Sequence, residues 1–229
     1  MEIETELHIP TAHLGRDRYS ILVAGIEGVG KSSLIERICT NSFPEASQVK
    51  LHKAVSKVIR NQNIRADLIE ADISEFRPSV HPTTISKAKQ FLDLNAVFLI
   101  YDCTNRKSFT LIQSEYFIIN RKLPPNCDVF LVGCKSDLTP KEVTPQEAET
   151  WAESMGISMF ETSSKSGTNC DMLIYEVLDG QAERQEATLE YYAEKENQVY
   201  GRPLMQEEEE RGNIVMSAFC FLPKWWFGR

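Results

Sequence analysis

Residues 20–38 read Ser-Ile-Leu-Val-Ala-Gly-Ile-Glu-Gly-Val-Gly-Lys-Ser-Ser-Leu-Ile-Glu-Arg-Ile, and this stretch decides the fold of the chain. It begins with an apolar run that is typical of a buried strand. A glycine-rich turn follows, and the spacing of Leu34, Ile35 and Ile38 then predicts an amphipathic helix. The sequence therefore predicts a strand, a tight loop and a helix in direct succession.

The turn has the pattern Gly-x4-Gly-Lys-Ser of a P-loop. Glycines let backbone N–H groups turn inward around phosphate oxygens, and the positive end of the following helix points at the same anion. We expect Lys31 to reach the β- and γ-phosphates and Ser32 to coordinate Mg²⁺. The alternative is a turn that merely joins strand to helix. The residues expected at the phosphates are Gly25, Glu27, Gly28, Val29, Gly30, Lys31, Ser32 and Ser33.

The composition of the 229 residues is that of a globular protein, with 42% hydrophobic and 25% charged residues. A net charge of −8 without a basic stripe argues against nucleic acid as a partner. The six cysteines form no C-x-x-C pair, so neither zinc nor a disulfide framework is indicated, and a reducing cytoplasmic compartment fits. No apolar run is long enough to span a bilayer, and the acidic start of the chain does not resemble a signal peptide.

Strand-like and helix-like patterns alternate from Tyr19 to Val177. This order predicts an α/β fold: a six-stranded, mostly parallel sheet with helices on both faces, as in P-loop NTPases. Because only Asn61 to Asn63 separate the second and third strands, we expect that pair to be antiparallel. The expected strands are 19–25, 52–60, 64–71, 96–101, 128–133 and 157–161, and the expected helices are 31–41, 83–94, 105–118, 145–156 and 171–178. We expect Thr83 or Thr84 to cap the second of these helices, Thr104 or Asn105 to cap the third, and Asn169 or Asp171 to open the last.

Three parts of the chain are distinguished by these patterns. We expect an N-terminal extension over 1–18, a single domain over 19–184 and a helical and aromatic tail over 185–229. A helix can continue through 187–195 before Gly201-Arg202-Pro203 breaks it.

Two polar segments follow later strands: Cys134-Lys135-Ser136-Asp137 and Glu161-Thr162-Ser163-Ser164-Lys165. Together with the P-loop they make the chain resemble a small GTPase of the Ras superfamily, of the Ras or Rab type, whose segments read Asn-Lys-x-Asp and Ser-Ala-Lys. The stretch 97–109 also resembles Rab sequences, and the resemblance covers about Tyr19 to Ala182. It implies a molecular switch that binds GTP and GDP with Mg²⁺.

Guanine recognition is what the resemblance implies for these segments. The carboxylate of Asp137 can accept both N–H donors on one edge of guanine, whereas the edge of adenine leaves it unpaired. The stem of Lys135 would pack along the base, and the backbone of Ser164 and Lys165 would serve guanine O6. The alternative for Asp137 is a turn residue. The residues expected at the base are Phe43, Cys134, Lys135, Asp137, Ser163, Ser164 and Lys165.

The chain departs from the family at two of these positions. Cys134 replaces the asparagine that ties the loops together, and a thiol is a weaker hydrogen-bonding group, so we expect lower nucleotide affinity. Glu27 replaces a small glycine in the P-loop, where a carboxylate faces phosphate and crowds the place at which an arginine finger would enter.

The second switch segment departs further, because the motif Asp-x-x-Gly-Gln is absent. Aligning the strand places Glu70 at the Mg²⁺-side aspartate, and a register two residues later places Asp72 there; the sequence leaves both open. In the first register Ile73 replaces the glycine that meets the γ-phosphate, and Ser74 replaces the glutamine that orients the attacking water. Serine is too short for that task, so Ser74 is a weak catalytic candidate.

The first switch segment also lacks a family feature. Residues 43–51 contain no threonine to bind Mg²⁺, and Ser47 is the only hydroxyl, out of register. The binding parts therefore survive better than the catalytic ones, and we expect slow GTP hydrolysis.

Three readings of the function compete. The first is a GTP/GDP switch with effector and exchange-factor partners in signalling or vesicle traffic. The second is a pseudo-GTPase that serves as a scaffold with little or no hydrolysis. The third, a P-loop kinase, is disfavoured because the guanine-reading segments are in register.

The aromatic end, residues 214–229, carries no prenylation motif. It suits peripheral contact with a membrane, docking into a partner, or folding back on the domain. We therefore expect a cytoplasmic protein that can lie on a membrane surface.

Overall fold

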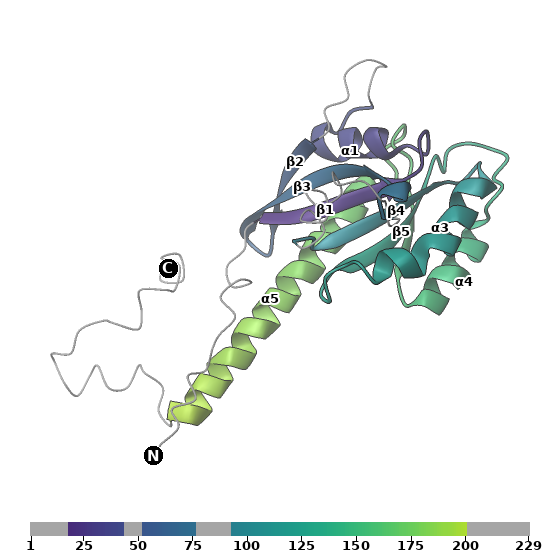
Figure 1. Cartoon of the computed structure of the whole chain (residues 1–229). Helices are drawn as coiled ribbons and strands as arrows, with labels where there is room; N and C mark the ends of the chain where they lie inside the picture. The colour runs from purple at the N-terminus through teal and green to yellow at the C-terminus, as the bar shows by residue number, and fades with distance from the viewer. Residues whose placement is uncertain (1–17, 44–51, 77–92, 201–229) are drawn as a thin grey trace. The chain divides into compact units, whose positions relative to one another are not determined.

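The computed structural model describes residues 18–43, 52–76 and 93–200 (Figure 1). Its strands are β1 (Arg18–Gly25), β2 (His52–Ile59), β3 (Gln62–Asp72), β4 (Ala96–Asp102), β5 (Asp128–Cys134) and β6 (Ser158–Glu161). Its helices are α1 (Lys31–Thr40), the 3-10 helix η2 (Ile73–Phe76), α3 (Arg106–Asn120), α4 (Pro145–Met155) and α5 (Cys170–Tyr200). Within this part of the chain, the strands form one sheet in the order β2-β3-β1-β4-β5-β6.

The sheet is parallel except at one edge, where β2 runs antiparallel to β3. The predicted α/β class with a six-stranded, mostly parallel sheet is therefore confirmed. All residues of β4 are buried, as expected for a central strand with both faces covered. Because the strands are parallel, their carboxyl ends meet at one edge, where the P-loop and both later polar segments follow β1, β5 and β6.

Helices cover both faces of the sheet. On one face, α3 and α4 pack against each other, with the rings of Tyr116 and Trp151 edge to face at 5.5 Å, and share a core cluster with Leu22 of β1. Neighbouring side chains of a strand point to opposite faces, so Val23 of β1 faces the other layer. There α1 packs against β1, β2 and β3 with its predicted apolar residues buried: Leu34, Ile35 and Ile38.

The helix ends follow the capping signals in the sequence. Asn105 Oδ1 accepts a hydrogen bond from Lys107 N at 3.1 Å at the start of α3, so the cap is Asn105 and not Thr104. The α4 helix begins with Thr144 as cap and Pro145 in the first turn and ends at Gly156, as predicted.

Two details differ from the sequence-based prediction. The β2–β3 turn is formed by Arg60 and Asn61, both left-handed with φ of 47° and 64°, which is earlier than expected. The helix expected at 83–94 lies outside the described residues except for its end, where Leu94 is buried but not helical.

By its contacts the chain divides into residues 17–181, which carry the sheet, and a unit that includes residues 182–229. The helix predicted at 187–195 is present, since α5 runs to Tyr200. Among the helices of the described ranges, none combines the length and the apolar character that crossing a bilayer requires.

Candidate functional site

The P-loop joins the carboxyl end of β1 to the first turn of α1. Gly30 is the N-cap of α1 with a left-handed φ of 110°, which a glycine adopts without strain, and no side chain caps the helix. Gly25 lies so close to β4 that a Cβ there would come within 2.6 Å of Ile100 O. The loop is therefore tight, and the first N–H groups of α1 are left for an anion.

Lys31 folds back over this loop. Its side chain is buried, and Nζ donates hydrogen bonds to Gly25 O at 3.0 Å and Ile26 O at 2.7 Å. Glu70 Oε1 lies 3.9 Å from the same nitrogen. Because an ammonium has three donors, the two carbonyls fix its position and still leave one donor for a ligand.

Ser32 selects between the two acidic candidates of β3. Its Oγ donates to Glu70 Oε2 at 2.7 Å, whereas the carboxylate of Asp72 accepts from Ser74 N at 2.8 Å. Burial alone would raise the pKa of Asp72, but the hydrogen bonds from Ser74 and the charge of Lys31 hold it below its ordinary value. The geometry thus pairs Ser32 with Glu70 and not with Asp72.

The hydroxyl oxygen of Ser32 and the carboxylate oxygens of Glu70 fit Mg²⁺, which prefers oxygen ligands. In the described residues no group of three or more His, Cys, Asp or Glu side chains could hold a metal ion.

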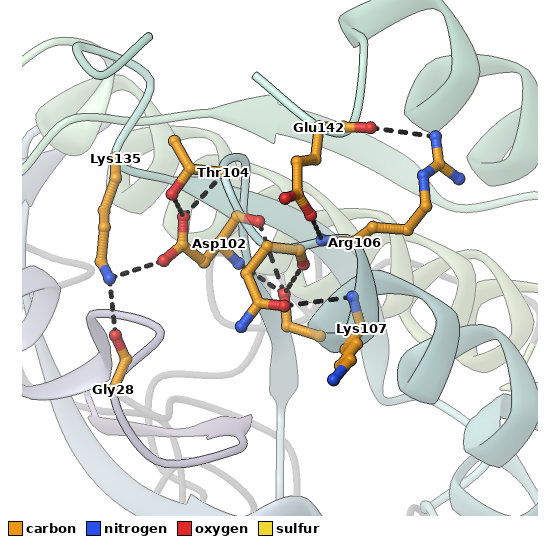
Figure 2. A network of polar contacts seen from close by, with 9 residues as sticks. Gly28, Asp102, Thr104, Arg106, Lys107, Lys135 and Glu142 are labelled. Atoms are coloured by element: carbon orange, nitrogen blue, oxygen red, sulfur yellow. Dashed lines mark hydrogen bonds and ion pairs between the residues drawn. The ribbon is translucent and has the colours of Figure 1, made fainter. Parts of the chain in front are cut away.

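Lys135 connects the base segment to the P-loop. Its Nζ donates to Gly28 O at 2.7 Å and to Asp102 Oδ2 at 2.6 Å, as Figure 2 shows. The other oxygen of Asp102 accepts from Thr104 N at 2.8 Å and Thr104 Oγ1 at 2.7 Å. Burial raises the pKa of Asp102, but Lys135 and Thr104 outweigh it, so this pKa lies below its ordinary value.

Sequence reasoning missed Asp102 as part of the site. The signal was its place directly after the apolar run 96–101, at the carboxyl end of a central strand. A charged residue there is buried only if a partner neutralises it, and Lys135 is that partner.

Asp137 lies exposed beside the β6–α5 loop. Ser163 Oγ donates to Asp137 Oδ1 at 2.6 Å, and Ser163 and Ser164 are both buried. The loop is a compact turn in which Gly167 N donates to Ser163 O at 2.8 Å. One carboxylate oxygen of Asp137 is thus fixed by the loop that the resemblance assigns to the base.

Cys134 is fully buried in the place of the family asparagine. Its Sγ lies 3.6 Å from Thr162 Oγ1 and packs near Gly30 of the P-loop. Burial raises the pKa of this thiol to about 12, despite the hydrogen bond with Thr162, so it stays neutral. The thiol fills space between loops and supplies one weak hydrogen bond.

The second switch segment begins in the core. The side chains of Ile73 and Phe76, both in η2, are 2% and 0% exposed and belong to the cluster that packs against α3 and α4. Ser74 lies exposed between them. Ser74 therefore lies on a short helix that the buried side chains of Ile73 and Phe76 anchor in the core.

Most predicted site residues meet at the carboxyl edge of the sheet, but some do not join the network. Glu27 is exposed on the P-loop, and Phe43, 48% exposed, is the last described residue before 44–51. The first switch segment, including Ser47, lies outside the described residues. Gly25 is the last residue of β1, and Cys134 is the last residue of β5. The other residues placed on the P-loop, at the start of α1 or on the loops after β5 and β6 are Glu27, Gly28, Val29, Gly30, Lys31, Ser32, Ser33, Lys135, Asp137, Ser163, Ser164 and Lys165.

A doubly wound sheet with this loop at its carboxyl edge defines a P-loop nucleotide-binding protein. The family model of the Ras family matches residues 20–182. The Ras-related protein Rab-1D of Dictyostelium discoideum is 32% identical over 154 residues, which cover 67% of this chain and 74% of that protein. The chain therefore belongs to the Ras family of small GTPases, which act as guanine-nucleotide-binding switches.

Proposed function

We propose that this chain binds GDP and GTP together with Mg²⁺ at the carboxyl edge of its sheet and hydrolyses GTP slowly. The observation that carries the proposal is the hydrogen bond between Lys135 Nζ and Gly28 O at 2.7 Å. It joins the base-reading segment to the phosphate loop, so that one nucleotide can span both.

The phosphate half of the proposed site consists of the loop amides, Lys31 and Ser32. The amides and the remaining donor of Lys31 bind phosphate oxygens. Ser32 and Glu70 would hold Mg²⁺, which neutralises charge on the β- and γ-phosphates when bound. Glu70 is proposed over Asp72 because Ser32 already contacts it.

The base half reads guanine through Asp137. Its carboxylate accepts the N1–H and amino donors of guanine, while Ser163 holds one of its oxygens in place. Adenine does not present these two donors and would forgo both hydrogen bonds to the charged carboxylate, each of about 1.5–3 kcal/mol. Lys135 packs its stem on the base, and Phe43 covers the base edge.

Slow hydrolysis follows from the second switch segment. Ser74 is too short to orient water as a glutamine does. Ile73, where the family has a glycine, has its side chain buried, so its backbone is not free to turn toward a γ-phosphate.

Nucleotide selectivity tests the proposal. Titration of the purified protein with labelled GDP, GTP and ATP should give saturable binding of both guanine nucleotides and at least about a hundredfold weaker ATP binding. Asp137→Asn should remove most of the guanine preference. Asp179→Asn is the matched control, since Asp179 pairs with Arg60 on the surface. Equal affinity for ATP would instead favour a P-loop kinase. Failure to bind any nucleotide would favour a pseudo-GTPase that serves as a scaffold.

We also propose effector and exchange-factor proteins as partners, in signalling or vesicle traffic, and a cytoplasmic location with peripheral membrane contact. The aromatic segment 214–229 lies outside the described residues. Co-sedimentation with anionic liposomes should be lost on deleting 214–229; equal sedimentation of both proteins would contradict the membrane role.

A further inference from the structure

One side chain of α1 joins the loop after β6 to the end of its own helix. Arg37 Nε donates to Ser164 O at 2.6 Å, and its Nη2 donates to Lys165 O at 2.8 Å. Its Nη1 donates to Asn41 O at 2.8 Å, at the end of the same helix. The guanidinium thus ties the loop after β6 to the helix that begins with Lys31 and Ser32.

Arginine suits this position for two reasons. Its planar fork carries five donors in fixed directions on three nitrogens, so it can hold three separated carbonyl groups at once, whereas all the donors of a lysine lie on one nitrogen. Its positive charge also lies in the last turn of α1, where the helix dipole favours a cation.

The bonds to Ser164 O and Lys165 O set the orientation of the loop peptides. The carbonyl of Ser164 and the N–H of Lys165 belong to one trans peptide, in which they point in opposite directions. Holding the carbonyl toward α1 therefore turns the Lys165 N–H away from α1. In the proposed function, this backbone serves guanine O6.

We propose that Arg37 is a positioning residue, which orients the Lys165 N–H for guanine O6 and thereby slows nucleotide release. The inference rests on the proposed function. Arg37 also fixes the carbonyl of Asn41, which lies two residues before Phe43. The same side chain therefore positions the backbone that leads from α1 to Phe43, the residue proposed to cover the base edge.

The first test measures GDP release from the full chain by stopped-flow fluorescence. Loss of charge-assisted hydrogen bonds in Arg37→Ala should accelerate release about tenfold, and Arg37→Lys, which keeps the charge, about threefold. Arg60→Ala is the matched control, since Arg60 is another arginine with an inter-segment partner, Asp179 of α5 at 2.7 Å, and does not contact the loop after β6. We expect its release rate to equal that of the wild type.

Two GDP analogues separate positioning from general loosening. In 6-thio-GDP a sulfur, a poor acceptor, replaces O6, while inosine diphosphate keeps O6 and lacks the amino group. Arg37→Ala should accelerate release of inosine diphosphate about tenfold, like GDP, but that of 6-thio-GDP by less than about threefold. A variant that is merely less stable would release all three faster by the same factor.

The outcomes distinguish the inference from the proposed function. If the wild type binds GDP and Arg37→Ala releases it at the wild-type rate, or accelerates all three nucleotides equally, the positioning role is wrong and the guanine site stands. If the wild type binds no guanine nucleotide, both are wrong.

Discussion

The side of the site that we propose to read the base and the second switch segment are held in place by different kinds of contact. Around Lys135 and Asp137, side chains hold one another by polar contacts: Asp102, Gly28 O and Ser163 are the partners. Around Ser74, the chain is held by two apolar side chains in the core, Ile73 and Phe76. The polar side, around Lys135 and Asp137, can bind a ligand without rearranging. The apolar side, around Ser74, can move only if Ile73 and Phe76 leave the core.

The free energies of the contacts involved indicate whether a bound nucleotide can move the second switch segment. Exposing two buried side chains costs about 1.5–3 kcal/mol each. One charge-assisted hydrogen bond from a backbone N–H to a γ-phosphate oxygen returns about 1.5–3 kcal/mol. Because a ligand shifts an equilibrium only by its differential affinity, we expect η2 to keep its place in both nucleotide states.

Truncating the apolar anchor should have the largest effect. Phe76→Ala removes a fully buried ring and should lower the free energy of unfolding by about 3–5 kcal/mol. Urea denaturation measures this loss. GDP affinity should change less than about threefold, since the polar side is untouched. A small stability loss with weakened GDP binding would reverse the roles of the two regions.

Removing the phosphate-binding cation should have the next largest effect. Lys31→Met keeps the stem and removes the charge, so GDP affinity should fall at least about a hundredfold, as expected for the loss of two charged contacts. Calorimetric titration measures it. Lys57→Met is the control, because Lys57 pairs with Asp171 on the surface. We expect the Lys57→Met protein to bind GDP with the affinity of the wild type. Unchanged affinity in Lys31→Met would exclude the P-loop as the phosphate site.

Asp102 tests the polar network with a smaller change. Asp102→Asn keeps an acceptor for Thr104 but weakens the hold on Lys135, and should speed GDP release about tenfold. Asp67→Asn, which loses ion pairs with Arg18 and Arg65 elsewhere on the sheet, should leave release unchanged. Equal release rates in wild type and Asp102→Asn would mean that Lys135 needs no anchor.

The same variant has a pH signature. The pKa of Asp102 is lowered in the folded protein, so its contribution to stability is present above its unfolded pKa of about 3.9 and is lost as pH falls through the lower folded value. The stability gap between wild type and Asp102→Asn should therefore shrink below about pH 4. A gap that stays constant from pH 6 to pH 3 would contradict the ionised pair.

The smallest effect is expected at the catalytic position. Ser74→Gln restores the family residue, but the buried side chain of Ile73 keeps the backbone where it is. Single-turnover GTP hydrolysis should rise no more than about twofold. A tenfold rise would show that the missing glutamine alone limits the reaction.

The elements of the fold could be predicted from sequence because each carries a local signal. The apolar run before Gly25 and the spacing of Leu34, Ile35 and Ile38 give β1 and α1 directly. Glu70 and Asp72 could not be separated in this way. They are two residues apart on one strand and so share a face, and only the contact with Ser32 distinguishes them.

The ties between segments could not be predicted. Arg37 meets Ser164 across 127 positions, and Lys135 meets Asp102 across 33. Neither pair leaves a periodic pattern, because such contacts depend on strand order and not on local spacing. The placement of Asp102 directly after the apolar run 96–101, at the end of β4, was the one usable hint.

Single-turnover hydrolysis of GTP measures whether this chain retains GTP binding while its turnover is impaired. The protein is loaded with GTP, Mg²⁺ is supplied, and released phosphate is followed over time. We predict stable GTP binding with a rate well below the intrinsic rate of about 4 × 10⁻⁴ per second known for Ras. A rate equal to or above that value would contradict the prediction that the second switch segment impairs GTP hydrolysis.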